Sequence, residues 1–166
     1  KKIIHAAAIV GNLAGESGLT MIEERSGGGG WGWAQWTGSR RTDFEAFAAE
    51  RGLPPTSEEA AYEFLVLELT TTEKHALDQT KKTTSLSSAT YTFEAQFERP
   101  ASLADAPTRT RYAQQALDAL PLLKPETPVV VDPPPPPPPP APITDMRTQD
   151  LIAAVVTLMQ TPEMAA

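Results

Sequence analysis

A block of prolines near the C-terminus most constrains what this chain can fold into. Residues 121–142 hold 12 of its 17 prolines, and the stretch over 133–140 is unbroken. Proline has a fixed φ and no amide donor, so such a stretch forms an extended polyproline helix of about 3.1 Å per residue. We interpret it as a stiff spacer of about 25 Å, in preference to a ligand for an SH3-like groove. Any compact core must then come from the residues on either side.

The chain is therefore expected to have three parts: a folded domain over 1–120, a proline-rich linker over 121–143 and a docking helix over 144–166. Residues 144–160 fit a helix capped by Thr144 or Asp145. A helix this short is not stable alone, so we expect its apolar stripe to dock on a partner. The stripe consists of Leu151, Ile152, Val155, Val156 and Met159.

Charge and composition exclude several classes of protein. The 166 residues carry a net charge of -7, which argues against non-specific nucleic-acid binding. There is no cysteine, so disulfides and thiolate metal sites are impossible. His5 and His75 lack ligand spacing, and we expect neither a metal nor a cofactor. No run approaches the ~20 apolar residues of a transmembrane helix. Beginning with Lys1-Lys2 and lacking a recognisable signal peptide, the chain reads as a piece of something larger.

Apolar periodicity over residues 1–120 predicts a mainly α domain. The second expected helix ends before Gly52 and the Pro54-Pro55 pair, and the third begins at Ser57. Residues 20–36 lack helical periodicity and are expected to include a small hairpin. The expected helices cover 2–15, 42–51, 57–69, a short segment from Thr71 or Thr72 to Leu77, 87–97 and 108–120.

One carboxylate near the end of the first expected helix could take part in a reaction. Glu16 follows Asn12 by four residues and Leu13 by three, so all three share a helix face and Glu16 lies at the edge of the buried stripe. A partly buried carboxylic acid holds its proton to higher pH and can protonate a glycosidic oxygen. The alternative is an ordinary glutamate at a helix end. The aromatic residues that come soon after Glu16 in the chain favour the chemical role.

All three tryptophans of the chain lie within a short glycine-bracketed segment, at Trp31, Trp33 and Trp36. Indole faces stack on sugar rings, and the amide of Gln35 can both donate to and accept from hydroxyl or N-acetyl groups. Alternation places Trp31, Trp33 and Gln35 on one side, so we expect these three to bind substrate and Trp36 to be core. The glycines over 27–30 are not followed by Gly-Lys-Ser/Thr, which argues against a phosphate-binding loop.

Together these motifs resemble the phage tail lysozyme family over roughly residues 3–120. The resemblance rests on Gly11-Asn12-Leu13, Glu16-Ser17-Gly18-Leu19, the stretch Gly32-Trp33-Ala34-Gln35-Trp36-Thr37-Gly38-Ser39-Arg40-Arg41, Leu67-Glu68-Leu69 and Phe97-Glu98-Arg99-Pro100. The family belongs to the lysozyme-like superfamily, with lytic transglycosylases and goose-type lysozymes. Membership implies a two-lobed, lysozyme-like α+β domain that cleaves the β-1,4 bond between N-acetylmuramic acid and N-acetylglucosamine.

The resemblance also implies roles for particular residues. The superfamily's catalytic glutamate falls on Glu16, and its glycine-rich aromatic segment ends at Gln35. Residues 97–100 and 109–113 match closing elements with a structural role, in which Glu98 is expected to pair with an arginine. The four glycines and Trp33 stand where relatives have Gly-Gly-Tyr-Gly-Ile, so the turn is expected to be looser.

Several alternatives remain open from the sequence. A second carboxylate for hydrolysis would come from Glu23, Glu24 or Asp43, none of which is singled out. Without one, a single-carboxylate route is favoured, in which Glu16 activates either water or the 6-hydroxyl of the substrate, so lysozyme and lytic transglycosylase both stay open. A non-catalytic virion structural or wall-binding protein is the rival class, and a proline-rich adaptor is a third. The appended residues 121–166 suggest attachment to a phage tail or other virion protein. We thus expect a virion-bound enzyme acting on the glycan strand of peptidoglycan at the cell wall.

Overall fold

The computed structural model describes residues 2–24, 27–100, 103–119 and 155, and these residues are mainly helical. This confirms the mainly α class expected from the sequence. The elements are α1 (Lys2–Ser17), α2 (Gly38–Glu50), α3 (Glu58–Thr70), α4 (Lys74–Lys82), α5 (Leu86–Phe93), the π-helix η1 (Glu94–Glu98) and α6 (Ala106–Ala119).

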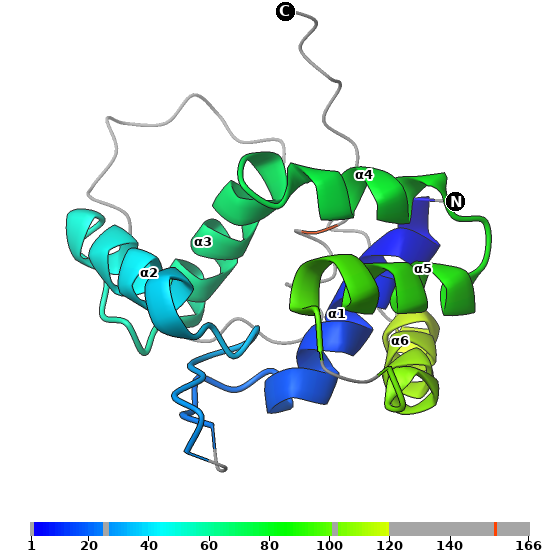
Figure 1. The fold of residues 1–166 in the computed structure, drawn as a ribbon, viewed down its shortest axis with the longest axis horizontal. Coiled ribbons are helices and arrows are strands. Elements are labelled where there is room, and N and C mark those ends of the chain that lie inside the picture. The colour runs from blue at the N-terminus through cyan, green and yellow to red at the C-terminus, as the bar shows by residue number, and fades with distance from the viewer. Residues whose placement is uncertain (1, 25–26, 101–102, 120–154, 156–166) are drawn as a thin grey trace, which may run out of the picture.

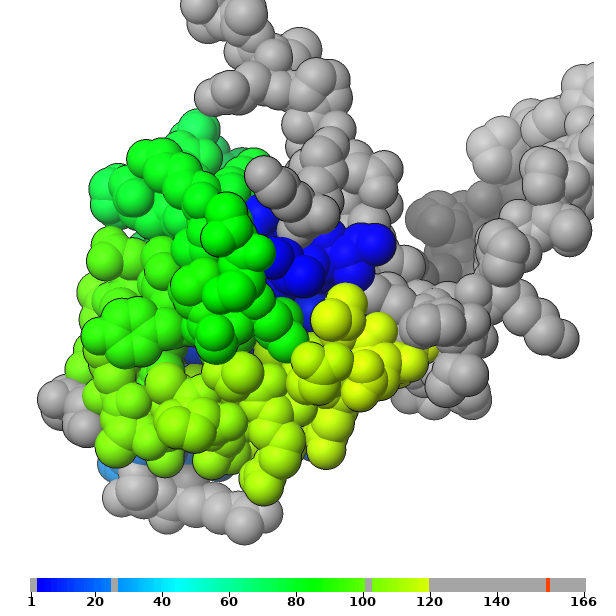
Figure 2. Space-filling model, turned by 90° about the vertical axis from the view of Figure 1, so that its right-hand side faces the viewer, coloured from blue at the N-terminus to red at the C-terminus, as the bar shows by residue number. Residues whose placement is uncertain are grey.

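The helices form two groups (Figure 1): a larger one of α1, α4, α5, η1 and α6, and a smaller one of α2 and α3. α1 packs most extensively on α6 and also contacts α5, while α4 packs on α5 and η1. α2 and α3 pack on each other, and α3 leads through a tight turn into α4. On the face shown in Figure 2, α4, α5 and α6 cover much of α1. The C-terminal end of α1 is thus left at the boundary between the large helical group and the loop that leads to α2.

The close packing of α1 on α6 depends on a glycine. A Cβ added at Gly11 would lie 2.5 Å from the backbone nitrogen of Ala113, which is far inside van der Waals contact. Ile9, Val10 and Leu13 on the same helix are almost completely buried. The absence of a side chain at Gly11 therefore sets how closely α6 approaches α1.

The second group has an aromatic core. Trp36 stacks on Phe44 with ring centroids 4.9 Å apart and meets Phe64 edge-on at 5.3 Å. The hydroxyl of Ser57 accepts a hydrogen bond from the backbone nitrogen of Ala60, which caps α3 and confirms the predicted start of that helix. This core holds α2 and α3 together and carries the segment that precedes α2.

Several elements differ from the expected boundaries. Among the residues that the structure describes, the expected small hairpin is represented by two isolated antiparallel bridges, Glu23 with Trp31 and Trp31 with Trp36. Positive-φ glycines at Gly27, Gly29 and Gly32 break the extended runs that paired strands need. α2 begins at Gly38 because Thr37 is already its extended N-cap. The helix expected over 87–97 changes to a π-helix at Glu94.

The predicted linker and most of the predicted docking helix lie outside the described residues. Val155 is the exception: it is helical, completely buried and part of the hydrophobic core of the domain. This residue of the predicted apolar stripe therefore packs on the helical domain itself. Across the described part of the chain, no helix is both long enough and apolar enough to cross a membrane.

Gly11→Ala is expected to lower the free energy of unfolding by about 2 kcal/mol or more, because the new methyl group overlaps the backbone of α6. Gly15→Ala is the matched control on the same helix. Its Cβ would meet Cγ of Arg109 at 2.9 Å, so a smaller loss of stability is expected there as well, because a side chain, even one held by ion pairs, can shift at lower cost than a helix backbone. Urea denaturation should rank Gly11→Ala well below Gly15→Ala in stability. Equal stabilities would contradict the close approach of the two backbones.

Candidate active site

A cavity of about 460 Å³ opens beside the C-terminal end of α1. The carboxyl group of Glu16 lies on its wall, and the side chain of Glu16 is 21% exposed. Gln35 comes from the glycine-rich loop and Tyr112 from α6, so three separate parts of the chain meet here. The full lining is Ala14, Glu16, Ser17, Gly18, Ile22, Glu23, Glu24, Gln35 and Tyr112. The structure thus brings together Glu16 and Gln35, the two residues that the sequence predicted for acid chemistry and substrate contact.

Arg109 holds the Glu16 end of α1 against α6. Its guanidinium group donates to the carboxylate of Glu16 and, at 2.9 Å, to the backbone oxygen of Asn12. The third nitrogen, Nε, lies 3.1 Å from Oε1 of Glu94 on η1. We name Arg109, Glu16 and Glu94 the Arg109 cluster. One buried cation thereby joins α1, η1 and α6 at the wall of the cavity.

Burial dominates the electrostatics of the Arg109 cluster. Glu94 is completely buried, and burial raises the pKa of its carboxyl while the charge of Arg109 lowers it. Asp105 and Glu16 add further negative charge, which also raises the pKa of Glu94. Neither carboxyl oxygen of Glu94 has a hydrogen bond of good geometry. Within the Arg109 cluster, the carboxyl group of Glu94 therefore lacks hydrogen-bond donors.

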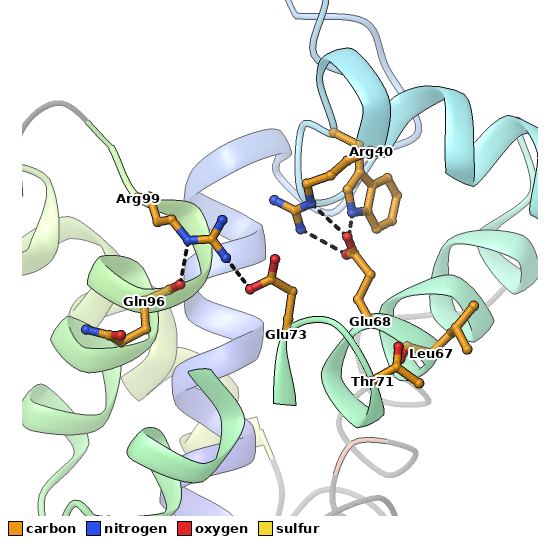
Figure 3. Close-up of polar contacts among 8 residues, drawn as sticks. Arg40, Leu67, Glu68, Thr71, Glu73, Gln96 and Arg99 are labelled. Carbon is orange, nitrogen blue, oxygen red and sulfur yellow. Dashed lines mark hydrogen bonds and ion pairs between the residues drawn. The ribbon is translucent and has the colours of Figure 1, made fainter. Parts of the chain in front are cut away.

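A second buried carboxylate organises the loop that carries Gln35. Glu68 on α3 accepts from the indole Nε1 of Trp36 at 2.7 Å and from two nitrogens of Arg40 at 2.7 and 2.9 Å (Figure 3). We name these three residues the Glu68 cluster. A bidentate guanidinium–carboxylate pair fixes direction as well as distance. It anchors both ends of the segment from Trp36 to Arg40 and so positions Gln35 directly before it.

Glu98, the last residue of η1, lies under the electrostatic influence of both clusters. Its pKa is raised to about 8, first by burial and then by the negative charge of Glu16. Arg109 and Arg40 lower the pKa, and Glu68 raises it. Oε1 of Glu98 is buried and has no hydrogen-bond partner, although the residue as a whole is partly exposed. A carboxyl group in this environment is held in its neutral form at neutral pH.

The expected pairing of Glu98 with an arginine is wrong within the described residues. Arg99, its neighbour, turns away in a left-handed conformation and pairs with Glu73 instead (Figure 3). Arg109 is already occupied by Glu16 and Glu94, and Arg40 by Glu68. Arg109 and Arg40 therefore act on Glu98 through their fields and not through a salt bridge.

The backbone of the glycine-rich loop holds Gln35 in position. Gln35 has a φ of +47°, and its amide nitrogen donates to the backbone oxygens of Gly32 at 2.8 Å and Ile22 at 3.3 Å. Gly32 has a φ of +69°, and a Cβ there would lie 3.0 Å from Met21. With its nitrogen occupied, Gln35 presents its amide oxygen as the group available to accept hydrogen bonds.

The tryptophans are distributed differently from the expected alternation. Trp36 is buried, as expected, but Trp33 is only 1% exposed and also belongs to the core. Alternation fails because the turn between Gly32 and Gln35 is not extended. Trp31 is partly exposed, donates to the backbone of Pro55 at 2.9 Å and lies under the guanidinium group of Arg41. It does not line the cavity with Glu16.

Of the carboxylates considered as partners for Glu16, two share its cavity. Glu23 lines the wall and pairs with Arg41 at 3.1 Å. Glu24 also lines the wall, and its Oε2 accepts from the backbone nitrogen of Gly30 at 3.3 Å. Asp43 lies on α2, away from the cavity lining. The candidates are thus narrowed to Glu23 and Glu24.

Sequence reasoning did not assign a site role to Arg109, Glu94 or Glu68. A charged residue at an otherwise apolar helical position is the signal that such residues give, because burial of a charge requires a partner. Glu68 stands between Leu67 and Leu69, and Arg109 falls on the α1-facing side of α6. The sequence could not show which partner each would find, since the partners are 28 and 93 residues away.

Glu98→Gln is expected to stabilise the folded protein at alkaline pH. The pKa of Glu98 in the folded state, about 8, lies above that of an unfolded glutamate, about 4.3. The folded state therefore binds more protons between these values, and stability falls as pH rises through this window. Glutamine carries no charge at any pH. The variant should match the parent near pH 4 and exceed it near pH 9 by up to about 5 kcal/mol, because each pKa unit between the folded and unfolded states corresponds to about 1.4 kcal/mol.

Calorimetric unfolding at both pH values measures this difference. Glu50→Gln, at the exposed end of α2, is the control and should show no pH-dependent gain. A stabilisation of Glu98→Gln that is equal at both pH values would contradict the raised pKa.

Comparison with known proteins places the helical domain and its cavity in one family. The family model described as phage tail lysozyme matches residues 2–120, which include every described element of the domain. No curated protein and no solved structure matches the chain significantly. The match covers well over half of the chain and includes the residues that line the cavity with Glu16 and those of the Arg109 and Glu68 clusters. The chain belongs to the phage tail lysozyme family, whose members have a lysozyme-like, peptidoglycan-degrading role.

Proposed function

We propose that this protein is a virion-associated glycosidase that cleaves the β-1,4 bond between N-acetylmuramic acid and N-acetylglucosamine when the phage genome enters the cell. The single observation that carries the proposal is the shared cavity of Glu16 and Gln35. A partly buried carboxyl group and a side-chain amide held by the backbone, both in the lining of one cavity, suit acid-catalysed cleavage of an N-acetylated glycan.

In the proposed reaction Glu16 first donates a proton to the leaving glycosidic oxygen as the bond to the sugar carbon breaks. It then accepts a proton from the attacking group, which is either water or the 6-hydroxyl of the same sugar. Gln35 accepts a hydrogen bond from a substrate hydroxyl or N-acetyl N–H and orients the sugar. Trp31 is assigned a place at the margin of the substrate path, because its ring is partly exposed but outside the cavity lining.

Both a hydrolase and a lytic transglycosylase fit the proposed chemistry. Hydrolysis with two carboxylates assigns the second role to Glu23 or Glu24, whereas attack by the 6-hydroxyl needs Glu16 alone. The products differ by one water, because transglycosylation leaves an anhydro sugar. Mass spectrometry of the fragments released from purified glycan strands separates the two.

The alternative is a non-catalytic virion structural or wall-binding protein on the same fold. A binding protein needs no proton donor at the position of Glu16, whereas acid-catalysed cleavage does. The same substitution therefore discriminates between the two classes.

Glu16→Gln is expected to reduce glycan-strand cleavage by at least ~100-fold, because the amide cannot donate a proton as an acid does. Release of soluble fragments from purified peptidoglycan measures the rate. Glu50→Gln is the matched control and should retain the parent rate. Full activity of Glu16→Gln would remove Glu16 from its assigned role, and retention of wall binding without any cleavage by the parent would favour the binding protein.

We further propose that residues 121–166 attach the domain to a tail or other virion component, with the polyproline stretch as spacer. Val155 packs in the core of the domain, so the attachment surface would be formed by other residues of this part.

The full chain is then expected to capture a virion protein from disrupted particles, and a chain ending at residue 120 should lose that capture while it still cleaves glycan strands. Affinity capture followed by mass spectrometry tests this. Equal capture by both chains would place the attachment surface on the domain instead.

A further inference from the structure

The two oxygens of the Glu16 carboxyl group have different surroundings. Oε1 accepts a hydrogen bond from Nη2 of Arg109. Oε2 has no hydrogen-bond partner among the residues that the structure describes, and the protein does not enclose it. Because Glu16 lines the cavity of about 460 Å³, Oε2 is the oxygen that is left for a substrate in that cavity.

The guanidinium group that holds Oε1 is itself fixed by further contacts. Nη1 of Arg109 donates to the backbone oxygen of Asn12 at 2.9 Å, and Nε forms an ion pair with Oε1 of Glu94 at 3.1 Å. The stem of Arg109 lies against Gly15, where an added Cβ would come within 2.9 Å of its Cγ. The side chain is only 8% exposed and is not part of the cavity lining. Arg109 therefore has little freedom to turn relative to the last turn of α1.

The chemistry of a guanidinium group decides which oxygen of Glu16 can carry a proton. Arginine has hydrogen-bond donors only, and it keeps its charge at every accessible pH. The oxygen that Arg109 holds must therefore act as an acceptor whether Glu16 is ionised or neutral. In the acid form, Oε1 is then the carbonyl oxygen and the proton is on Oε2.

We propose that Arg109 is a positioning residue, which holds Oε1 of Glu16 so that Oε2 presents the acid proton to the cavity. This inference rests on the function proposed above. The proton leaves Oε2 for the glycosidic oxygen while the bond from that oxygen to the sugar carbon breaks, and the electron pair of this bond goes to the leaving oxygen. The negative charge that forms on Glu16 lies beside Arg109. Oε2 then takes a proton from the attacking water or hydroxyl, so Glu16 ends the cycle as an acid.

Glu94 accounts for the presence of a cation beside a group that must act as an acid. An arginine paired with a single carboxylate strongly favours the ionised form of that carboxylate. Here one guanidinium group serves both Glu16 and the completely buried Glu94. Glu94 thus holds Nε of Arg109 in place and also opposes the positive charge that acts on Glu16.

Arg109→Met tests the proposal, because it keeps an unbranched side chain but removes the donors and the charge. We expect kcat for glycan-strand cleavage to fall roughly 10- to 100-fold, since the carboxyl group loses its orientation. KM should change little, because Arg109 does not line the cavity. The alkaline limb of the kcat profile should move to higher pH, since the charge that favours ionised Glu16 is gone. Arg51→Met, at an exposed position after α2, is the control and should reproduce the parent values.

The other ionisable groups around Glu16 are the same in all these proteins, so a moved limb reports the charge at position 109. They are Glu94 and Glu98 of η1 and, in the cavity lining, Glu23, Glu24 and Tyr112.

Arg109→Lys separates charge from geometry. Lysine keeps the positive charge, but its single nitrogen cannot reproduce the planar fork that reaches Glu16, Asn12 and Glu94 together. The alkaline limb should therefore stay near that of the parent, while kcat remains about 10-fold lower. All rates are measured at a temperature where circular dichroism shows the variants to be folded, and Arg109→Lys decides the proposal by its kcat if Arg109→Met does not fold. A parental kcat in Arg109→Lys, or an unmoved limb in Arg109→Met, overturns the proposal.

The positioning also has a readout that does not need enzymatic activity. In nitrogen-15 NMR spectra of the parent, Nη1 and Nη2 of Arg109 should give separate signals, because the contacts with Asn12 and Glu16 oppose rotation about the bonds to Cζ. In Glu16→Ala, Nη2 loses its acceptor and the two signals should broaden or merge. Averaged signals in the parent, or signals unchanged in Glu16→Ala, contradict the positioning role. An inactive parent with separate signals contradicts only the proposed function.

Discussion

The position of Arg109 between Glu16 and Glu94 is the interaction on which the rest of the site depends. A guanidinium group buried to this extent must satisfy its donors inside the protein. It donates hydrogen bonds to the carboxylate of Glu16 and the backbone oxygen of Asn12 on α1, while its Nε forms only an ion pair with Glu94 on η1 and makes no hydrogen bond. α6 can supply this cation only because Gly11 lets its backbone come close to α1. The packing of two helices and the placement of the candidate acid are therefore one structural feature.

The Glu68 cluster anchors the glycine-rich loop, as Arg109 anchors the Glu16 end of α1. A loop with several positive-φ glycines has little rigidity of its own, and its two isolated bridges are weak restraints. The carboxylate of Glu68 fixes the indole of Trp36 and the guanidinium of Arg40 from the adjacent helix. Rigidity at the end of the loop keeps Gln35 on the same wall as Glu16. Glu98 completes the arrangement as a carboxyl group under the field of both clusters.

The tryptophan segment shows where sequence reasoning fails and why. Alternation assumes an extended backbone, and it placed Trp33 beside Gln35 on the cleft side. The turn at Gly32 instead rotates Trp33 into the core, where its backbone oxygen accepts from the hydroxyl of Ser17. The helices were predicted more successfully because their apolar periodicity is a local property that burial preserves. Boundaries shifted where the backbone alone sets the helix start, as at Thr37 before α2, which is extended and makes no side-chain capping hydrogen bond.

The sequence by itself determined that a helical domain precedes a proline-rich part, that Glu16 ends the first helix and that the motifs around it belong to a lysozyme-like family. These are properties of local pattern and residue chemistry. The tertiary structure decided what surrounds Glu16: the cation from α6, the cavity shared with Gln35 and the carboxyl group of Glu98. Residues up to 93 positions apart create that environment, and the protonation of a buried group depends on the charges that folding brings near it and on the water that folding removes.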